Sequence, residues 1–175
     1  MTSFSSLLPQ NVVDAVINKH LKAGAVLRLF CDFTTPQKYK FVMLASVEPL
    51  QVFIINSEIH PYILNNPDLL ADQVDIPQVD HSFLSHDSIL NCVQAHQAFN
   101  ISHLRQILLE DFSQIYKGEL RPYVLRNVID VIEKSVNLSK ITKRKSLKPS
   151  KKTTSHKLAV AKVNVFCSIL IVFDY

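Results

Sequence analysis

The segment that decides the fold class is residues 39–57, YKFVMLASVEPLQVFIINS. Residues 39–46 and 50–57 are two runs rich in β-branched and aromatic side chains, a composition typical of β-strands. Only Val47, Glu48 and Pro49 separate the two runs. Because so short a connection joins only neighbouring antiparallel strands, the segment predicts a β-hairpin.

Further strands and helices are predicted on both sides of this hairpin. Residues 25–33, 72–76 and 86–94 have the composition of strands, whereas apolar residues recur at helical spacing in residues 8–24, 101–116 and 120–138. Asn11 is the expected N-cap of the first helix and Gly24 its stop, while Pro122 suits the first turn of the last helix. The fold predicted is α+β: a small, mostly antiparallel β-barrel or sheet with an N-terminal helix and two C-terminal helices.

Charge divides the chain into a domain and a tail. Residues 1–139 hold 10 Lys and Arg against 14 Asp and Glu, a net charge of −4, whereas residues 140–175 hold 9 against 1, or +8. We expect one folded domain over residues 1–139 and a disordered basic linker over 140–157. Residues 158–175 are apolar, but they are shorter than the roughly 20 residues of a membrane helix, so they predict a strand and no membrane span.

Composition argues against several classes of protein. The chain has only 2 Gly, which argues against the Gly-rich phosphate loops of Rossmann and P-loop folds. Its 3 Cys lie far apart without metal-ligand spacing, and its first residues lack the basic and apolar regions of a signal peptide. We therefore expect a cytoplasmic protein with free thiols, no cofactor and no metal.

Residues 79–92, VDHSFLSHDSILNC, form a polar segment with several interpretations. His81 or His86 could transfer a proton near neutral pH, Asp87 could orient a neighbouring side chain, and Ser88 could bind a phosphate oxygen. The same residues could instead cap a turn and begin a strand. A metal site with ligands from His81, His86, Asp87 and Cys92, and with His60 and His96 nearby in sequence, is a third alternative, although the spacing matches no zinc pattern.

Two lysines and a tyrosine at the start of the hairpin form a second candidate site. Lys38 and Lys40 flank Tyr39, so the three residues could present two cations and a stacking ring to a nucleic acid. Alternatively, the lysines mark the solvated edge of the hairpin.

Three segments in this order resemble the PemK/MazF-type toxin family. YKFVMLAS (39–46) is similar to the second strand of the family and VFIINSE (52–58) to its next core strand. HDSILNCVQ (86–94), followed by YKGELRPYVLRNVIDVI (116–132), is similar to its late strand and its closing Gly-then-helix segment. The resemblance covers residues 25–139 and implies an SH3-like β-barrel with appended helices, which in this family is often a homodimer.

The resemblance also implies an activity and the residues that perform it. The family cleaves single-stranded RNA without a metal, through the 2′-hydroxyl of the RNA, and is partnered by an antitoxin protein. Matching the strands places Lys40 where the family has Arg, and a lysine offers a point charge in place of a two-pronged guanidinium. The predicted catalytic residues are Lys40, Ser57 and Asp87, and the predicted substrate-binding residues are Lys38, Tyr39, Asn56, Ser88 and His86.

Two alternatives to an enzyme remain open. The same barrel could be a non-catalytic module that binds a protein partner or nucleic acid. The apolar end could also assemble the chain into a larger complex. RNA cleavage separates the first alternative from the nuclease, and deletion of residues 158–175 tests the second.

Overall fold

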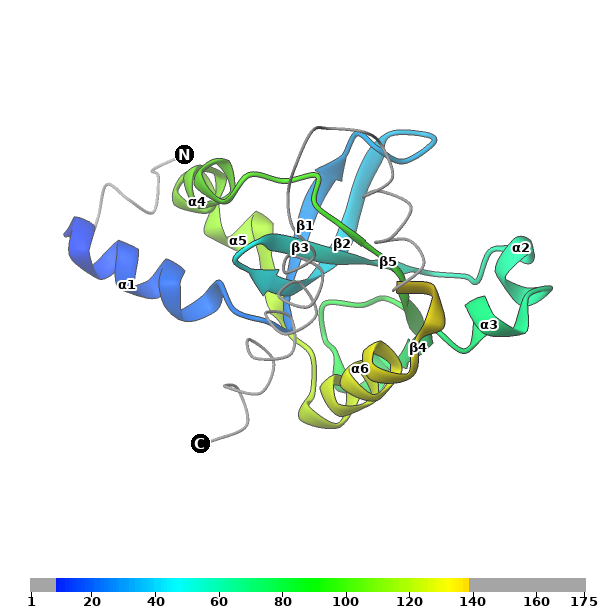
Figure 1. The fold of residues 1–175 in the computed structure, drawn as a ribbon. Coiled ribbons are helices and arrows are strands. Elements are labelled where there is room, and N and C mark those ends of the chain that lie inside the picture. The colour runs from blue at the N-terminus through cyan, green and yellow to red at the C-terminus, as the bar shows by residue number, and fades with distance from the viewer. Residues whose placement is uncertain (1–8, 139–175) are drawn as a thin grey trace, which may run out of the picture.

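A computed structural model describes residues 9–138, which form a mixed α+β domain around one curled antiparallel sheet (Figure 1). The sheet has six strands in the order β4-β5-β3-β2-β1-β6, so β4 and β6 are its edges. The strands are β1 (Ala25–Cys31), β2 (Lys38–Val47), β3 (Leu50–Asn56), β4 (Gln73–Ile76), β5 (Ser88–His96) and β6 (Tyr116–Glu119). The predicted α+β class is confirmed, with a half-barrel of strands at its centre.

The helices fall into two groups and a short arm. They are α1 (Gln10–His20), α2 (Pro61–Leu64), α3 (Pro67–Leu70), α4 (Ile101–Glu110), α5 (Phe112–Ile115) and α6 (Pro122–Lys134), with a 3-10 turn at Gln78–Asp80. Helix α6 lies on one side of the sheet, and α1 and α4 lie on the other (Figure 1). The α2–α3 arm extends from one end of the sheet and contributes no buried residue to the core (Figure 1).

Side chains that alternate between the two faces of the strands form two cores, one on each face of the sheet. On β2, Met43 packs into the core under α6, whereas Val42 and Leu44 pack into the core under α1 and α4. Because successive side chains of a strand point to opposite faces, a strand buried on both sides has an almost continuous apolar sequence. This is why residues 39–57 carry so strong a strand signal.

The predicted hairpin is present. Strands β2 and β3 pair antiparallel, with Val42 opposite Ile54 and Val47 opposite Leu50, so that Glu48 and Pro49 form the turn. The same register continues beyond the core, so the polar residues at the start of β2 lie beside the polar residue at the end of β3.

Two local predictions were wrong. Asn11 lies inside α1, which Pro9 precedes as the N-cap, since the fixed φ of proline already suits a helix entry. Residues 116–119, expected to be a helix end and a break, form the edge strand β6 against β1. Gly118 adopts φ +146° there, and a Cβ at this position would lie 3.1 Å from the Phe83 ring, so a glycine fits this strand.

A buried polar network ties the end of α6 to β4. Asp72, which is only 2% exposed, accepts hydrogen bonds from Ser135 Oγ (2.8 Å) and Asn137 Nδ2 (2.9 Å). Asn137 Nδ2 also donates to the backbone oxygen of Asp68 at 2.8 Å. The network therefore anchors the α3–β4 connection, in which Leu69 and Gln73 each line a surface hollow.

The predicted basic linker and apolar C-terminal segment lie outside the described residues, as does Cys167. Cys31 and Cys92 are buried free thiols. Between residues 9 and 138, no helix has both the length and the apolar character required to cross a membrane.

Candidate functional site

A polar continuation of one sheet face forms the candidate site. Lys38 and Lys40 pair across the sheet with Cys31 and Leu29, two members of the core under α1 and α4. The lysines therefore share the face of that core, beyond the part that the helices cover. At the same end of the sheet, Lys40 Nζ donates a hydrogen bond to Asn56 Oδ1 at the end of β3.

Two adjoining hollows lie over this polar region. One, the Tyr62 hollow, has a volume of about 450 Å³ and includes Lys38, Tyr62 and His96 in its lining. The other, the Ser57 hollow, has a volume of about 300 Å³ and includes Ser57 and His60. Both hollows are also lined by Lys40, Asn56, Ile63 and Asn91. We call the two hollows together the Lys40 groove, because this shared set lies where they meet.

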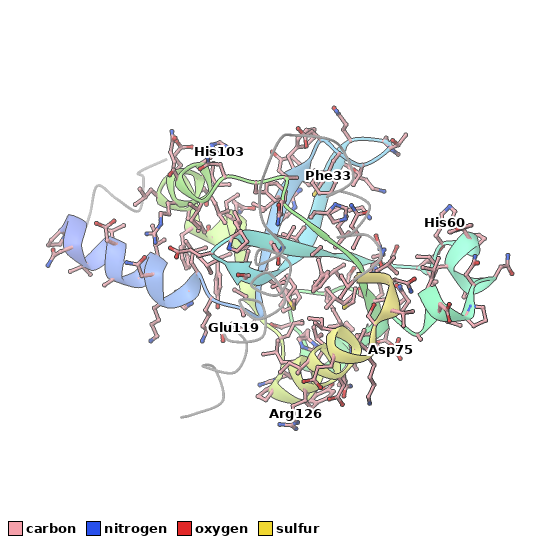
Figure 2. All side chains as sticks on the ribbon, in the orientation of Figure 1. Phe33, His60, Asp75, His103, Glu119 and Arg126 are labelled. Atoms are coloured by element: carbon pink, nitrogen blue, oxygen red, sulfur yellow. The ribbon has the colours of Figure 1, made fainter. Side chains whose placement is uncertain are left out.

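The position of the groove follows from the arrangement of the helices. Figure 2 shows His60 on the α2 side of the molecule, at the end of the sheet away from His103 on α4. The α2–α3 arm thus forms a wall of the groove, and the helices that cover the rest of this face leave the groove open.

The carboxamides at the centre of the groove are oriented by groups that can only donate. Asn56 Oδ1 accepts from the Lys40 ammonium, and Asn91 Oδ1 accepts from the backbone N–H of Val93 at 3.1 Å and from Gln73 Nε2 at 3.2 Å. Since an ammonium and a backbone N–H cannot accept, each amide oxygen is identified without ambiguity. The Nδ2 groups of Asn56 and Asn91 donate to no protein atom within residues 9–138.

The groove centre is consequently a set of donors. It presents one ammonium group and two carboxamide N–H₂ groups whose acceptor atoms are already engaged. Such a set is complementary to a ligand rich in acceptors, and most of all to an anion. A phosphodiester, with two non-bridging oxygens and a negative charge, has this character.

Partial burial strengthens the electrostatic field at this point. Desolvation by burial, together with the neighbouring charge of Lys38, lowers the pKa of the Lys40 amine, and the Cys31 thiol opposes this shift only in part. Burial also raises the pKa of that thiol, so that Cys31 stays neutral near pH 7 and does not offset the charge of Lys40. A cation in a partly desolvated groove attracts an anion more strongly than one in bulk water.

No family model, curated protein or solved structure matches this chain. The resemblance to the PemK/MazF-type toxins therefore stays a prediction from sequence.

Four of the predicted site residues gather at the groove. Lys40 and Asn56 lie at its centre, Lys38 lines the Tyr62 hollow, and Ser57 lines the Ser57 hollow. The resemblance places Lys40 and Ser57 in one site, so the β2–β3 hairpin must bring these two residues together. The observed register does so, because Asn56 is hydrogen-bonded to Lys40 and Ser57 follows it in the chain.

Tyr39 lies on the opposite face of β2 from the two lysines. It pairs across the strands with Phe30, whose ring is 5.4 Å away, and the Arg28 guanidinium carbon lies 4.4 Å from the centre of the Tyr39 ring. Alternation along β2 causes this separation, because Tyr39 stands between Lys38 and Lys40 in sequence. Tyr39 therefore does not share the groove with them.

The predicted trio of Asp87, Ser88 and His86 lines neither hollow. Asp87 Oδ1 accepts from the backbone N–H of Gln78 at 2.8 Å, and Ser88 Oγ donates to the His86 carbonyl at 3.2 Å. Ser88 is buried because it alternates with Leu90 and Cys92 toward the α6 side of the sheet. These contacts match the alternative prediction of a turn that leads into a strand.

His81 is a buried structural residue. Its Nδ1 lies 2.8 Å from the Pro77 carbonyl, and its Nε2 accepts from the backbone N–H of Arg121 at 3.1 Å, so both ring nitrogens are engaged. Cys92, the thiol of the metal alternative, is fully buried, and burial raises its pKa. Within the described part of the chain, no three His, Cys, Asp or Glu side chains converge in a way that could hold a metal ion.

Several groove residues were missed from the sequence. They are Glu58, Tyr62, Gln73 and Asn91, whereas His60 was named only beside the metal alternative. Asn91 carried a faint signal, as a polar residue on a strand next to Leu90 and Cys92. Glu58 directly follows the predicted Ser57 in sequence. Tyr62 reaches the groove through the path of the α2–α3 arm and Gln73 through β4–β5 pairing, which local sequence does not specify.

Proposed function

We propose that the chain is a toxin-like, metal-independent endoribonuclease that binds single-stranded RNA in the Lys40 groove. The observation that carries this proposal is the donor set of Lys40, Asn56 and Asn91 where two hollows meet. A phosphodiester placed there has room for a nucleotide on each side. The PemK/MazF resemblance supplies the reaction type.

The residues around the donor set supply a chemically balanced route. Glu58, the carboxylate among the described residues that line the Ser57 hollow, takes the proton of the RNA 2′-hydroxyl. The 2′-oxygen attacks phosphorus and forms a 2′,3′-cyclic phosphate as the bond to the 5′-oxygen breaks. Lys40 gives that oxygen a proton, which its lowered pKa favours, and Asn56 and Asn91 stabilise the charge that develops on phosphorus.

A non-catalytic module is the second candidate. It is favoured by the position of Asp87, the carboxylate predicted to orient a catalytic side chain, which is engaged with Gln78 and lies outside both hollows. In this case the groove binds RNA, or an acidic segment of a protein partner, without cleaving it.

Finer parts of the resemblance belong to the same proposal. They are an SH3-like barrel, a homodimer and an antitoxin partner, and the cytoplasmic location expected from the cysteines and the N-terminal sequence is proposed with them. The curled six-stranded antiparallel sheet is compatible with a small barrel. Size-exclusion chromatography with light scattering distinguishes a dimer of the 19.9 kDa chain from a monomer.

Incubation of the full chain with end-labelled single-stranded RNA in EDTA tests the proposal. We expect fragments with 2′,3′-cyclic phosphate ends, and none with the Lys40→Ala variant. Binding without fragments from the wild-type chain would select the non-catalytic module. If the wild-type chain neither binds nor cleaves the RNA, an RNA function for the groove is refuted.

A further inference from the structure

Tyr62 is the exposed aromatic side chain that the fold places at the groove. It is 65% exposed, begins the α2–α3 arm next to Pro61, and lines a hollow together with Lys38 and Lys40. We propose that the Tyr62 hollow is a base-stacking subsite, which holds the nucleotide adjacent to the phosphate at Lys40. This inference rests on the proposed RNA function of the groove.

The backbone of Tyr62 is fixed although its ring is exposed. The Tyr62 N–H donates to His60 Nδ1 at 3.1 Å, and the Tyr62 carbonyl accepts from Asn66 Nδ2. Pro61 restricts the backbone further at the first position of α2. An aromatic ring held at its base and free at its face provides a stacking surface at low entropic cost.

The dimensions of the hollow suit one nucleotide between two phosphates. Lys38 and Lys40 are two residues apart on one face of β2, which separates their Cα atoms by about 6.6 Å. Both lysines line the hollow, so two successive phosphates of an extended strand can each meet an ammonium group. The base between them then enters the 450 Å³ space bounded by Tyr62.

The lining of the hollow includes a second aromatic ring. His96 supplies it, and the His96 ring stacks on Phe33 with their centres 4.7 Å apart at an angle of 27°. Asn91 and Gln94 add polar atoms to the lining. A flat, polar-edged ligand such as a nucleobase matches this combination, because stacking accepts any base and the polar edge can select among them.

Tyr39 provides a matched comparison within the same protein. Its ring is 55% exposed, close to the value for Tyr62, but it lies on the opposite face of β2 beneath Arg28. Removing either ring removes a similar exposed surface and no charge. The subsite predicts that only the Tyr62 variant affects RNA binding.

The test is fluorescence anisotropy of a labelled single-stranded RNA with full-length variants. Tyr62→Ala should weaken binding about 5- to 150-fold, as expected for loss of one base stack, without changing the dependence of affinity on salt. Tyr62→Phe should bind like the wild type, and Tyr39→Ala within twofold of it. Circular dichroism should show the same thermal unfolding for Tyr62→Ala as for the wild type, since the ring is outside the core.

A scan of abasic positions along the RNA completes the test. At one position, removing the base should weaken wild-type binding and erase the difference between the wild type and Tyr62→Ala. Wild-type affinity for Tyr62→Ala, together with weakened binding by Lys40→Ala, would overturn the stacking subsite alone. Wild-type affinity for both variants would overturn the proposed function and the subsite with it.

Discussion

Replacing Lys40 with alanine should weaken binding of single-stranded RNA about 10- to 150-fold and abolish its cleavage. The substitution removes a charge-assisted hydrogen bond to phosphate, a contact worth about 1.5–3 kcal/mol. It also frees Asn56 Oδ1 to face the ligand as an acceptor, which reverses the polarity of one group at the groove centre. The measurement is RNA affinity across a series of KCl concentrations, in which the salt slope should become shallower by about 0.7.

Controls for this prediction separate charge, position and protonation. Lys19→Ala removes an exposed lysine from α1 and should leave affinity within twofold of the wild type. Burial and the charge of Lys38 lower the pKa of Lys40. As the pH rises, wild-type binding should therefore weaken below the pH near 10.4 at which an ordinary lysine loses its proton. Lys40→Arg should lack this alkaline loss. Binding by Lys40→Ala that equals the wild type at low salt would contradict the role given to Lys40.

The second large effect expected is on stability. Asp72→Ala should lower the free energy of unfolding by about 2–4 kcal/mol, because the side-chain donors of Ser135 and Asn137 lose a buried carboxylate partner. Urea denaturation measures it, as a lower midpoint with an unchanged m-value. The loss also loosens the α3–β4 connection, so RNA affinity should decline in the same variant.

Asp68→Ala is the matched control for Asp72. Asp68 is exposed, and it joins the network through its backbone oxygen alone, which the substitution retains. We expect a change of less than about 0.5 kcal/mol, as is usual for surface positions. An equally small effect of Asp72→Ala would show that the network does not hold the end of α6 in place.

Local sequence predicted the strands whose burial is strongest. Residues 39–57 are buried on both faces over most of their length, so their apolar pattern is dense and their short turn leaves little choice of pairing. Strand β6 was missed because its four residues, YKGE, have no strand composition. It exists because it pairs with β1 and because Gly118 admits the Phe83 ring.

Only the part of the candidate site that lies on the β2–β3 hairpin was predictable from sequence. Lys40 and Ser57 meet because the register of β2 and β3 follows from their sequence. Asp87 belongs to a loop whose path depends on a contact with Gln78, and Tyr62 reaches the groove through a turn in the α2–α3 arm. Asn91 is oriented by Gln73, its partner on the edge strand β4. Individual side-chain contacts of this kind leave no periodic trace in sequence.

Donation from the groove centre to RNA is measured directly by the response of the Asn56 and Asn91 side-chain amides. Their ¹H–¹⁵N resonances, assigned by Asn56→Asp and Asn91→Asp substitution, would be followed while a short single-stranded RNA is added. If the groove centre donates to a phosphodiester, both Nδ2 resonances should shift and saturate together at the Kd of binding. If RNA binds while both amide resonances stay unmoved, the RNA lies elsewhere on the protein, and the groove centre does not donate to it.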